Sequence, residues 1–209
     1  MTGNIITAAA FIVLAVYHAR LIWMIRHHPL KTALGQADHL RGLWVESIMS
    51  ERRDILAVQT LRNFTMASSF LASTAILIAL GVIRVMISPE QIATVTHALN
   101  IMGGNSERLQ LIKLMIVSLD FLFVFFQFAL AVRYYNHVGF IINTPPKLDC
   151  CGSPLYVAGI LRRGALHYTL GTRGYFFAVP FCLWLFGPIW LLAGAVVITM
   201  ALWGIDRHV

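Results

Sequence analysis

Four polar side chains recur every seven residues within a long apolar run: Lys113, Asp120, Gln127 and Tyr134. Seven residues make nearly two helical turns, so these side chains fall on one slowly drifting face of a helix. An ionised Asp120 near the centre of a membrane span costs roughly 3 kcal/mol, so it should face a protein interior or a water-filled cavity. The spacing predicts either a lining for ions, protons or a small polar solute, or a seam between helices whose polar groups bond to one another.

His18 is a second residue whose position could support chemistry in a membrane. It lies near the midpoint of the first apolar run, at a depth close to that expected for Asp120. A His18–Asp120 pair would spare both groups an unpaired burial and could relay protons. Alternatively, His18 donates a hydrogen bond that joins two helices.

A further polar face is predicted between residues 59 and 73. It consists of Gln59, Arg62, Asn63, Ser69 and Ser73, with Met66 and Phe70 between them. Steps of three and four place these side chains on one side of a helix, where they could line a path for a polar solute. The small Ser and Ala residues of this stretch would also let another helix approach closely, so packing is the alternative.

The sequence offers little that could hold a metal or a cofactor. His27 and His28 are adjacent rather than on one helix face, and no HxxxH or HExxH motif occurs. Two facing histidines could ligate haem, but only His18 lies well inside an apolar run. A glycine-rich phosphate loop is absent, and so is a nucleophile with a base and an orienting group. We therefore expect no metal, no cofactor and no catalytic residue.

The helices that position these residues must lie in a membrane. Of the 209 residues, 58% are hydrophobic and only 12% are charged, and the mean hydropathy is +0.75. Soluble domains carry roughly 25% charged residues, so lipid is the expected solvent for this chain. The net charge is +7, but the basic residues flank apolar runs. This placement indicates the positive-inside effect and argues against a nucleic-acid partner.

The apolar runs predict an all-α, polytopic membrane protein with one membrane domain, residues 1–209. Its four transmembrane helices are expected at 5–25, 64–86, 109–132 and 175–203, with loops at 26–54 and 133–174. The second helix should begin near Leu40, and the third should continue to Ile142, so that both have long cytoplasmic extensions.

Two further features concern the last third of the chain. The segment 155–170 is too polar to span a bilayer by itself and is expected at the membrane interface. Gly187 and Pro188 lie inside the fourth predicted span, where a Gly-Pro pair should kink a helix near mid-membrane. Such a kink could gate a path for a solute.

The distribution of basic residues predicts the orientation. Twelve of the 16 Lys and Arg residues lie in or beside the two loops, and four lie elsewhere. By the positive-inside rule, both loops should be cytoplasmic and both termini should lie outside. The expected location is the plasma membrane, which would be the inner membrane in a bacterium.

Five stretches also match the pattern of a known family: Tyr17–His18, residues 55–63, residues 121–126, Asn136 with residues 141–145, and residues 185–188. Through them, the sequence resembles the Domain of Unknown Function 599 family of bacterial and plant membrane proteins. The resemblance covers most of the chain and implies a membrane protein of four helices. It implies no activity and transfers no catalytic residue.

Two functional hypotheses of different classes follow. The first is a channel or transporter for an ion or a small polar solute. Four helices seldom enclose a wide pore, so this hypothesis requires a homo-oligomer. The second is a structural or accessory subunit of a membrane complex, whose basic loops bind a protein partner or anionic lipid. An enzyme acting on lipid would need an acid–base pair at headgroup depth, which Arg62 and Asn63 do not supply.

Overall fold

The computed structural model describes residues 2–51, 53–88, 90, 94, 107–143 and 153–207. The described residues form six α-helices and one short 3-10 helix: α1 (Thr2–His27), η1 (Pro29–Lys31), α2 (Ala33–Glu51), α3 (Asp54–Met86), α5 (Glu107–Ile141), α6 (Pro154–Trp184) and α7 (Pro188–Arg207). Four of these helices, α1, α3, α5 and α7, are long and apolar enough to cross a membrane. The prediction of an all-helical, multi-pass membrane protein with four apolar spans is confirmed.

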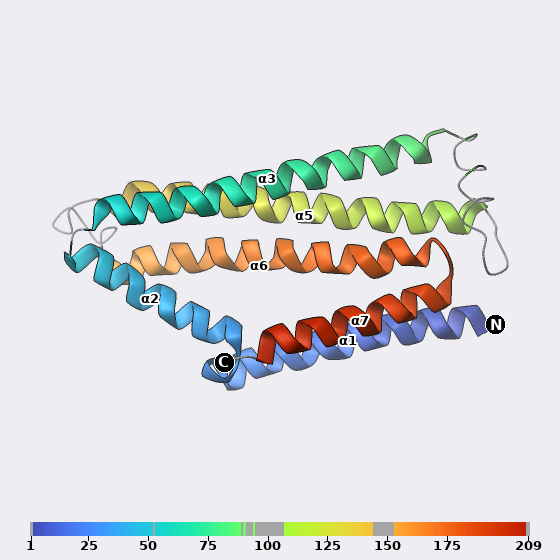
Figure 1. Cartoon of the computed structure of the whole chain (residues 1–209), viewed down its shortest axis with the longest axis horizontal. Coiled ribbons are helices and arrows are strands. Elements are labelled where there is room, and N and C mark those ends of the chain that lie inside the picture. The colour runs from blue at the N-terminus through green and yellow to red at the C-terminus, as the bar shows by residue number, and fades with distance from the viewer. Residues whose placement is uncertain are drawn as a thin grey trace.

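The long helices lie roughly parallel to one axis in three layers (Figure 1). α3 and α5 form one outer layer, α1 and α7 form the other, and α6 runs between them. At one end, α3, α5 and α6 extend beyond α1 and α7, and α2 crosses obliquely over this projecting part. Val45 and Ile48 of α2 pack there against a core that includes Tyr135 of α5 and Leu161 of α6. The long extension predicted for the third span is therefore present, and the second span also continues beyond its predicted apolar run, although only from Asp54.

The fourth predicted span is not one kinked helix, so this prediction is wrong. α6 ends at Trp184, a turn follows, and α7 begins at Pro188 and runs back along the bundle. Gly187 has φ 143°, a conformation that side chains other than glycine rarely adopt. Proline suits the first position of a helix because its missing N–H would be unpaired there anyway. The Gly-Pro pair therefore ends one helix and starts the next.

Residues 155–170 do not form a separate interfacial segment, contrary to the prediction. They make up the first half of α6, which is continuous to Trp184. α5 covers this half on one side and α2 covers it on another. Its polar residues are tolerated because neighbouring helices, rather than lipid, surround much of the helix.

The continuous helix predicted from Leu40 to Met86 is also wrong. α2 ends at Glu51, and Arg53 has φ −84° and ψ 54°, outside the helical range. No Pro or Gly marks this break in the sequence. The break lets α2 turn away from the axis of α3 and pack on α6, so tertiary contacts override the local helix preference.

The two ends of the chain lie at opposite ends of the bundle (Figure 1). A Cβ atom at Gly3 would lie 3.7 Å from Cγ of Pro188, and Tyr17 contacts Asp206 near the end of α7. α1 and α7 are therefore parallel, because both start at the end of the bundle where Gly3 meets Pro188 and run towards the level of Tyr17 and Asp206. The prediction that both termini lie outside counted residues 175–203 as one crossing, and the structure divides this stretch between α6 and α7.

Glycines on α6 allow α5 to approach closely. A Cβ atom at Gly171 would lie 2.8 Å from the ring of Phe128, and one at Gly174 would lie 2.3 Å from Cγ2 of Val124. In a bilayer, small residues of this kind let helices gain contact area at short range. The polar positions of α5 identified from the sequence lie beside this contact.

Candidate functional site

The predicted polar face of α5 lies along its contact with α6. Lys113 is buried, and its Nζ atom lies 5.9 Å from the ring centroid of Trp184. His167 of α6 and Gln127 form a hydrogen bond of 2.7 Å between Nδ1 and Oε1. Tyr134 stacks on the same imidazole, with centroids 5.4 Å apart and planes 7° apart. A seam between two helices of one chain accounts for these three positions.

Asp120, the fourth position of this face, differs from the others. Its Oδ2 atom is buried and makes no hydrogen bond to any residue that the structure describes. The predicted pair with His18 is not formed, because the imidazole instead bonds Leu14 of its own helix and Arg173 of α6. Asp120 is therefore an acid within an apolar helix whose Oδ2 atom has no hydrogen bond among the described residues.

The predicted polar face of α3 points away from the rest of the chain. Gln59, Arg62, Asn63, Ser69 and Ser73 are all exposed. The opposite side of α3, which packs on α5, is built from small residues: Ala57, Ser68, Ala72, Ala75 and Ala79. The chain itself thus leaves the polar face of α3 uncovered.

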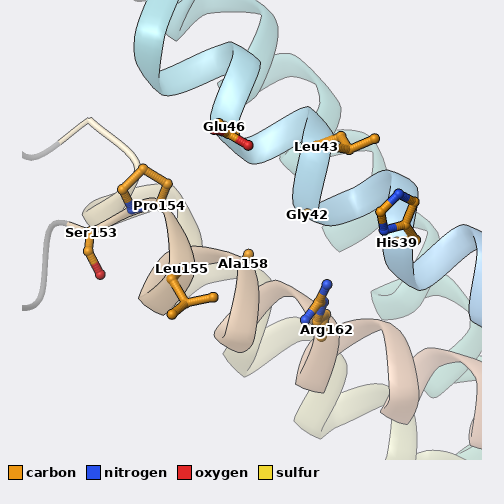
Figure 2. A pocket seen from close by; sticks show the side chains of 9 residues that line it. All are labelled: His39, Gly42, Leu43, Glu46, Ser153, Pro154, Leu155, Ala158 and Arg162. Atoms are coloured by element: carbon orange, nitrogen blue, oxygen red, sulfur yellow. The ribbon is translucent and has the colours of Figure 1, made fainter.

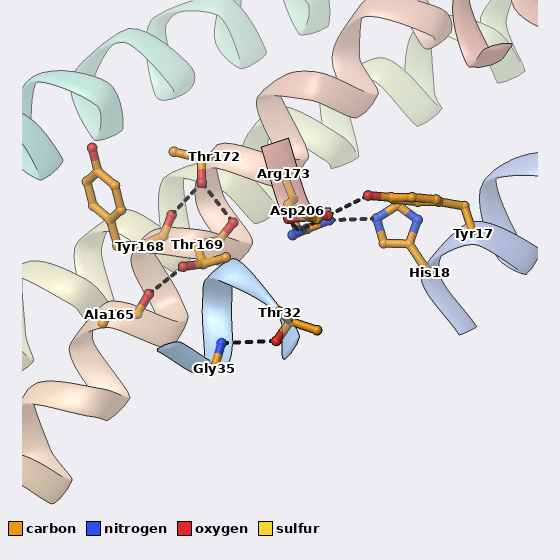
Figure 3. A network of polar contacts seen from close by, with 10 residues as sticks. All are labelled: Tyr17, His18, Thr32, Gly35, Ala165, Tyr168, Thr169, Thr172, Arg173 and Asp206. Carbon is orange, nitrogen blue, oxygen red and sulfur yellow. Dashed lines mark hydrogen bonds and ion pairs between the residues drawn. The ribbon is translucent and has the colours of Figure 1, made fainter. Parts of the chain in front are cut away.

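A charged pair that the sequence analysis missed lies inside the bundle. Arg173 of α6 is 8% exposed and Asp206 of α7 is 7% exposed. Nη2 of Arg173 donates to both carboxylate oxygens of Asp206 at 2.7 Å (Figure 3). Removing an ionised group from water costs several kcal/mol unless an opposite charge compensates it, so each residue depends on the other.

Two residues of α1 complete this arrangement. The Tyr17 hydroxyl donates to Oδ2 of Asp206, and Nε2 of His18 lies 3.4 Å from Nη1 of Arg173. A guanidinium can only donate, so Nε2 accepts and Nδ1 donates to the carbonyl oxygen of Leu14 at 2.9 Å. These bonds describe a neutral imidazole. We call Tyr17, His18, Arg173 and Asp206 the buried polar cluster.

The buried polar cluster joins three helices and offers two kinds of ion contact. A solute anion could replace the carboxylate at Arg173, and a cation could replace the guanidinium at Asp206. Tyr17 and Asp206 also line a groove between α1 and α7, so one edge of the cluster is open to that groove. Among the described residues, no three His, Cys, Asp or Glu side chains are grouped so that they could hold a metal ion.

The sequence signal for this cluster was present but misinterpreted. Arg173 falls inside the loop predicted at 133–174, and Gly171 and Gly174 beside it are residues of the type that often interrupts helices. Both glycines instead lie within α6, where Gly171 packs against Phe128 and Gly174 packs against Val124. Glycines on either side of an arginine, followed by an apolar stretch, are equally compatible with a tightly packed helix inside a membrane.

A second cavity lies where α2 packs on the first half of α6 (Figure 2). This open pocket has a volume of about 430 Å³ and contains His39, Glu46 and Arg162. Nε of Arg162 pairs with Asp38 at 3.2 Å, and a Cβ atom at Gly42 would lie 3.0 Å from its Nη2 atom. The glycine gives the guanidinium room to lie against α2.

Comparison with known proteins identifies the family. A family model described as "Protein of unknown function, DUF599" matches residues 5–209, essentially the whole chain. The chain therefore belongs to this family. No curated protein and no solved structure matches it.

Proposed function

We propose that this member of the DUF599 family carries an ion or a small polar solute across the bilayer, with the buried polar cluster as the contact for that solute. The observation that supports the proposal is the Arg173–Asp206 pair inside a bundle of apolar helices. Ionisable residues at membrane depth usually mark ion, proton or solute pathways. Well-packed apolar residues would join the helices as firmly as a buried ion pair does, so packing alone gives little reason for these charges.

The geometry suggests how a solute would be handled. Asp206 accepts from Arg173 and Tyr17 at once, so either bond can be exchanged for a bond to a solute while the other remains. Arg173 belongs to α6 and Asp206 to α7, so exchange of the Arg173 bond would loosen the outer layer of α1 and α7 from the central helix. Gly187 and Pro188, predicted as a gate, would then act as the pivot of the α6–α7 hairpin.

The proposal includes assembly into a homo-oligomer. Within the span, the exposed polar face of α3 would lie against lipid in a single copy, and lipid offers no hydrogen-bond partner to side chains such as Ser69 and Ser73. Copies that meet at this face would give these groups partners or would line a shared path. Lys113, Gln127 and Tyr134, which lie between α5 and α6, would contribute to such a path from inside each copy.

Flux measurements in proteoliposomes test the proposal. Vesicles with the purified protein would be challenged in turn with gradients of H⁺, Na⁺, K⁺ and Cl⁻, and each flux would be followed with an encapsulated dye that responds to that ion. We expect a flux above that of protein-free vesicles that falls at least tenfold in Arg173→Gln. Arg84→Gln is the matched control, because Arg84 is an exposed arginine near the other end of the bundle. Equal flux with and without protein, or equal flux in Arg173→Gln and wild type, would contradict the proposal.

The alternative is an accessory subunit, and the pocket between α2 and α6 favours it specifically. This pocket lies on the projecting part of the bundle, beside Glu46 and Arg162, where a partner protein could reach it. In this case, the protein purified from its own membrane should bring a stoichiometric partner. That partner should be lost in Leu43→Glu, which places a charge in the pocket, and retained in Arg84→Gln.

We also propose an orientation. The C-terminal end of α7 lies at the same end of the bundle as the two loops, so Arg207 joins the basic residues counted there. Thirteen of the 16 Lys and Arg residues then belong to one side, and only Arg84, Arg108 and Lys113 belong to the other. The positive-inside rule places the first side in the cytoplasm, in a plasma membrane, with the N-terminus outside.

A further inference from the structure

A long groove runs between α1 and α7 and ends at the start of α2. It has a volume of about 800 Å³, within the range of about 300–1,000 Å³ in which ligand sites fall. Most of its length is apolar, with Ile12, Val13, Val16 and Met200 among the lining residues. The groove is therefore shaped for a chain-like apolar group.

Polar groups gather at one end of the groove. Tyr17, Arg20, Thr32 and Asp206 all line it, in the part nearest the end of α1. Thr32 is buried, donates to the Pro29 carbonyl oxygen at 2.9 Å and accepts from the Gly35 N–H at 3.2 Å. The turn before α2 thus closes this end of the groove, and the hydroxyl of Thr32 already has hydrogen-bond partners within that turn.

Arg20 is the charge at this end that remains available. Asp206 is occupied by Arg173 and Tyr17. None of the acids that the structure describes pairs with Arg20, whose side chain is exposed. Arg20 lies seven residues before the end of α1, about 10 Å along the axis. A long arginine side chain at this depth reaches the headgroup layer while its stem stays in hydrocarbon.

We propose that the groove binds a phospholipid with an anionic headgroup, held by its phosphate at Arg20, with one acyl chain along Val13, Val16 and Met200. An apolar groove with a cationic end complements such a lipid at both ends. Inorganic phosphate would leave the apolar length unused, and a neutral apolar molecule would leave Arg20 unpaired. This site is independent of the proposed transport, because it requires no change in the buried polar cluster.

Native mass spectrometry of the purified full-length protein tests the site. The protein would be titrated in detergent with phosphatidylglycerol and, separately, with phosphatidylcholine of the same acyl chains. We expect wild type to bind phosphatidylglycerol at least tenfold more tightly. Both lipids carry a phosphate, but the choline cation of phosphatidylcholine offsets its charge, whereas phosphatidylglycerol keeps a net negative charge for the Arg20 guanidinium to meet. Arg20→Gln should therefore remove this preference. Arg84→Gln, at the other end of the bundle, should preserve it.

A second variant tests the apolar part of the groove. Val16→Trp would fill the groove and should weaken the binding of both lipids, whatever their charge. Equal affinity of wild type for the two lipids would overturn the proposal, and so would a preference that survives in Arg20→Gln. Should Arg20→Gln fail to fold, the wild-type comparison and Val16→Trp still decide the question. If wild type shows no ion flux but still prefers phosphatidylglycerol, the transport proposal is rejected and the lipid site is retained.

Discussion

Replacing Asp206 with Asn tests whether the buried pair holds α1, α6 and α7 together. The change preserves the shape of the side chain and removes its charge, so Arg173 stays buried, at 8% exposure, without a compensating charge. Removing one partner of a buried ion pair costs about 3–5 kcal/mol. In a chain of this length, 1 kcal/mol shifts Tm by about 2–4 °C. We therefore expect Asp206→Asn to lower Tm by roughly 6–20 °C.

The assay is thermal unfolding in one detergent, followed by intrinsic tryptophan fluorescence. The double variant Arg173→Met/Asp206→Leu is the matched control, because it removes both charges and leaves none uncompensated. It should melt within a few degrees of wild type, since apolar replacements of buried pairs are often neutral. Two results would refute the reasoning: an unchanged Tm in Asp206→Asn, or a double variant that melts as low as the single one.

Three further predictions concern packing and topology. Gly187→Ala should cost about 1–2 kcal/mol because its φ is positive, whereas Gly204→Ala, with open space around it, should not lower Tm. Gly174→Ala should cost about 1–3 kcal/mol by overpacking, and Val124→Ala in the same chain should recover part of the loss; thermal unfolding measures both, with Gly159→Ala as the control. Epitope tags in intact and permeabilised cells should place the N-terminus outside and the C-terminus inside, and tags on one common side would contradict a topology in which α6 crosses the membrane in addition to α1, α3, α5 and α7.

The four apolar helices were predictable because their apolar character reflects the solvent rather than any particular neighbour. α6 was not predictable in the same way. Its first half carries Arg162 and Arg163, and Arg173 interrupts the second half, so its mean hydropathy stays below that of a helix facing lipid. α6 remains inside the bundle because other helices cover it, and coverage of that kind depends on the whole fold.

The candidate site divides along similar lines. The seven-residue spacing on α5 predicted a single polar face, and Gln127 and Tyr134 indeed meet one residue, His167. A periodic pattern on one helix is a local property, so it can be derived from sequence. The Arg173–Asp206 contact joins two helices, and it exists only because Gly187 reverses the chain between them. The contact between Arg173 and Asp206 therefore depends on the turn at Gly187, and the spacing of these residues along the sequence does not predict it.

The direction of the helices gives the strongest argument that α6 crosses the membrane. α5 and α7 run the same way along the bundle (Figure 1), so if both span the bilayer the chain must return between them, and α6 is the segment that returns. Arg162 and Arg163 then lie near the basic end, and Arg162 pairs there with Asp38. Arg173 lies further along α6, where its side chain is buried, and there the last turn of α7 supplies Asp206 as its partner. The polarity that hides α6 in a hydropathy profile is therefore consistent with a crossing helix, because its most deeply placed charge is neutralised from within the chain.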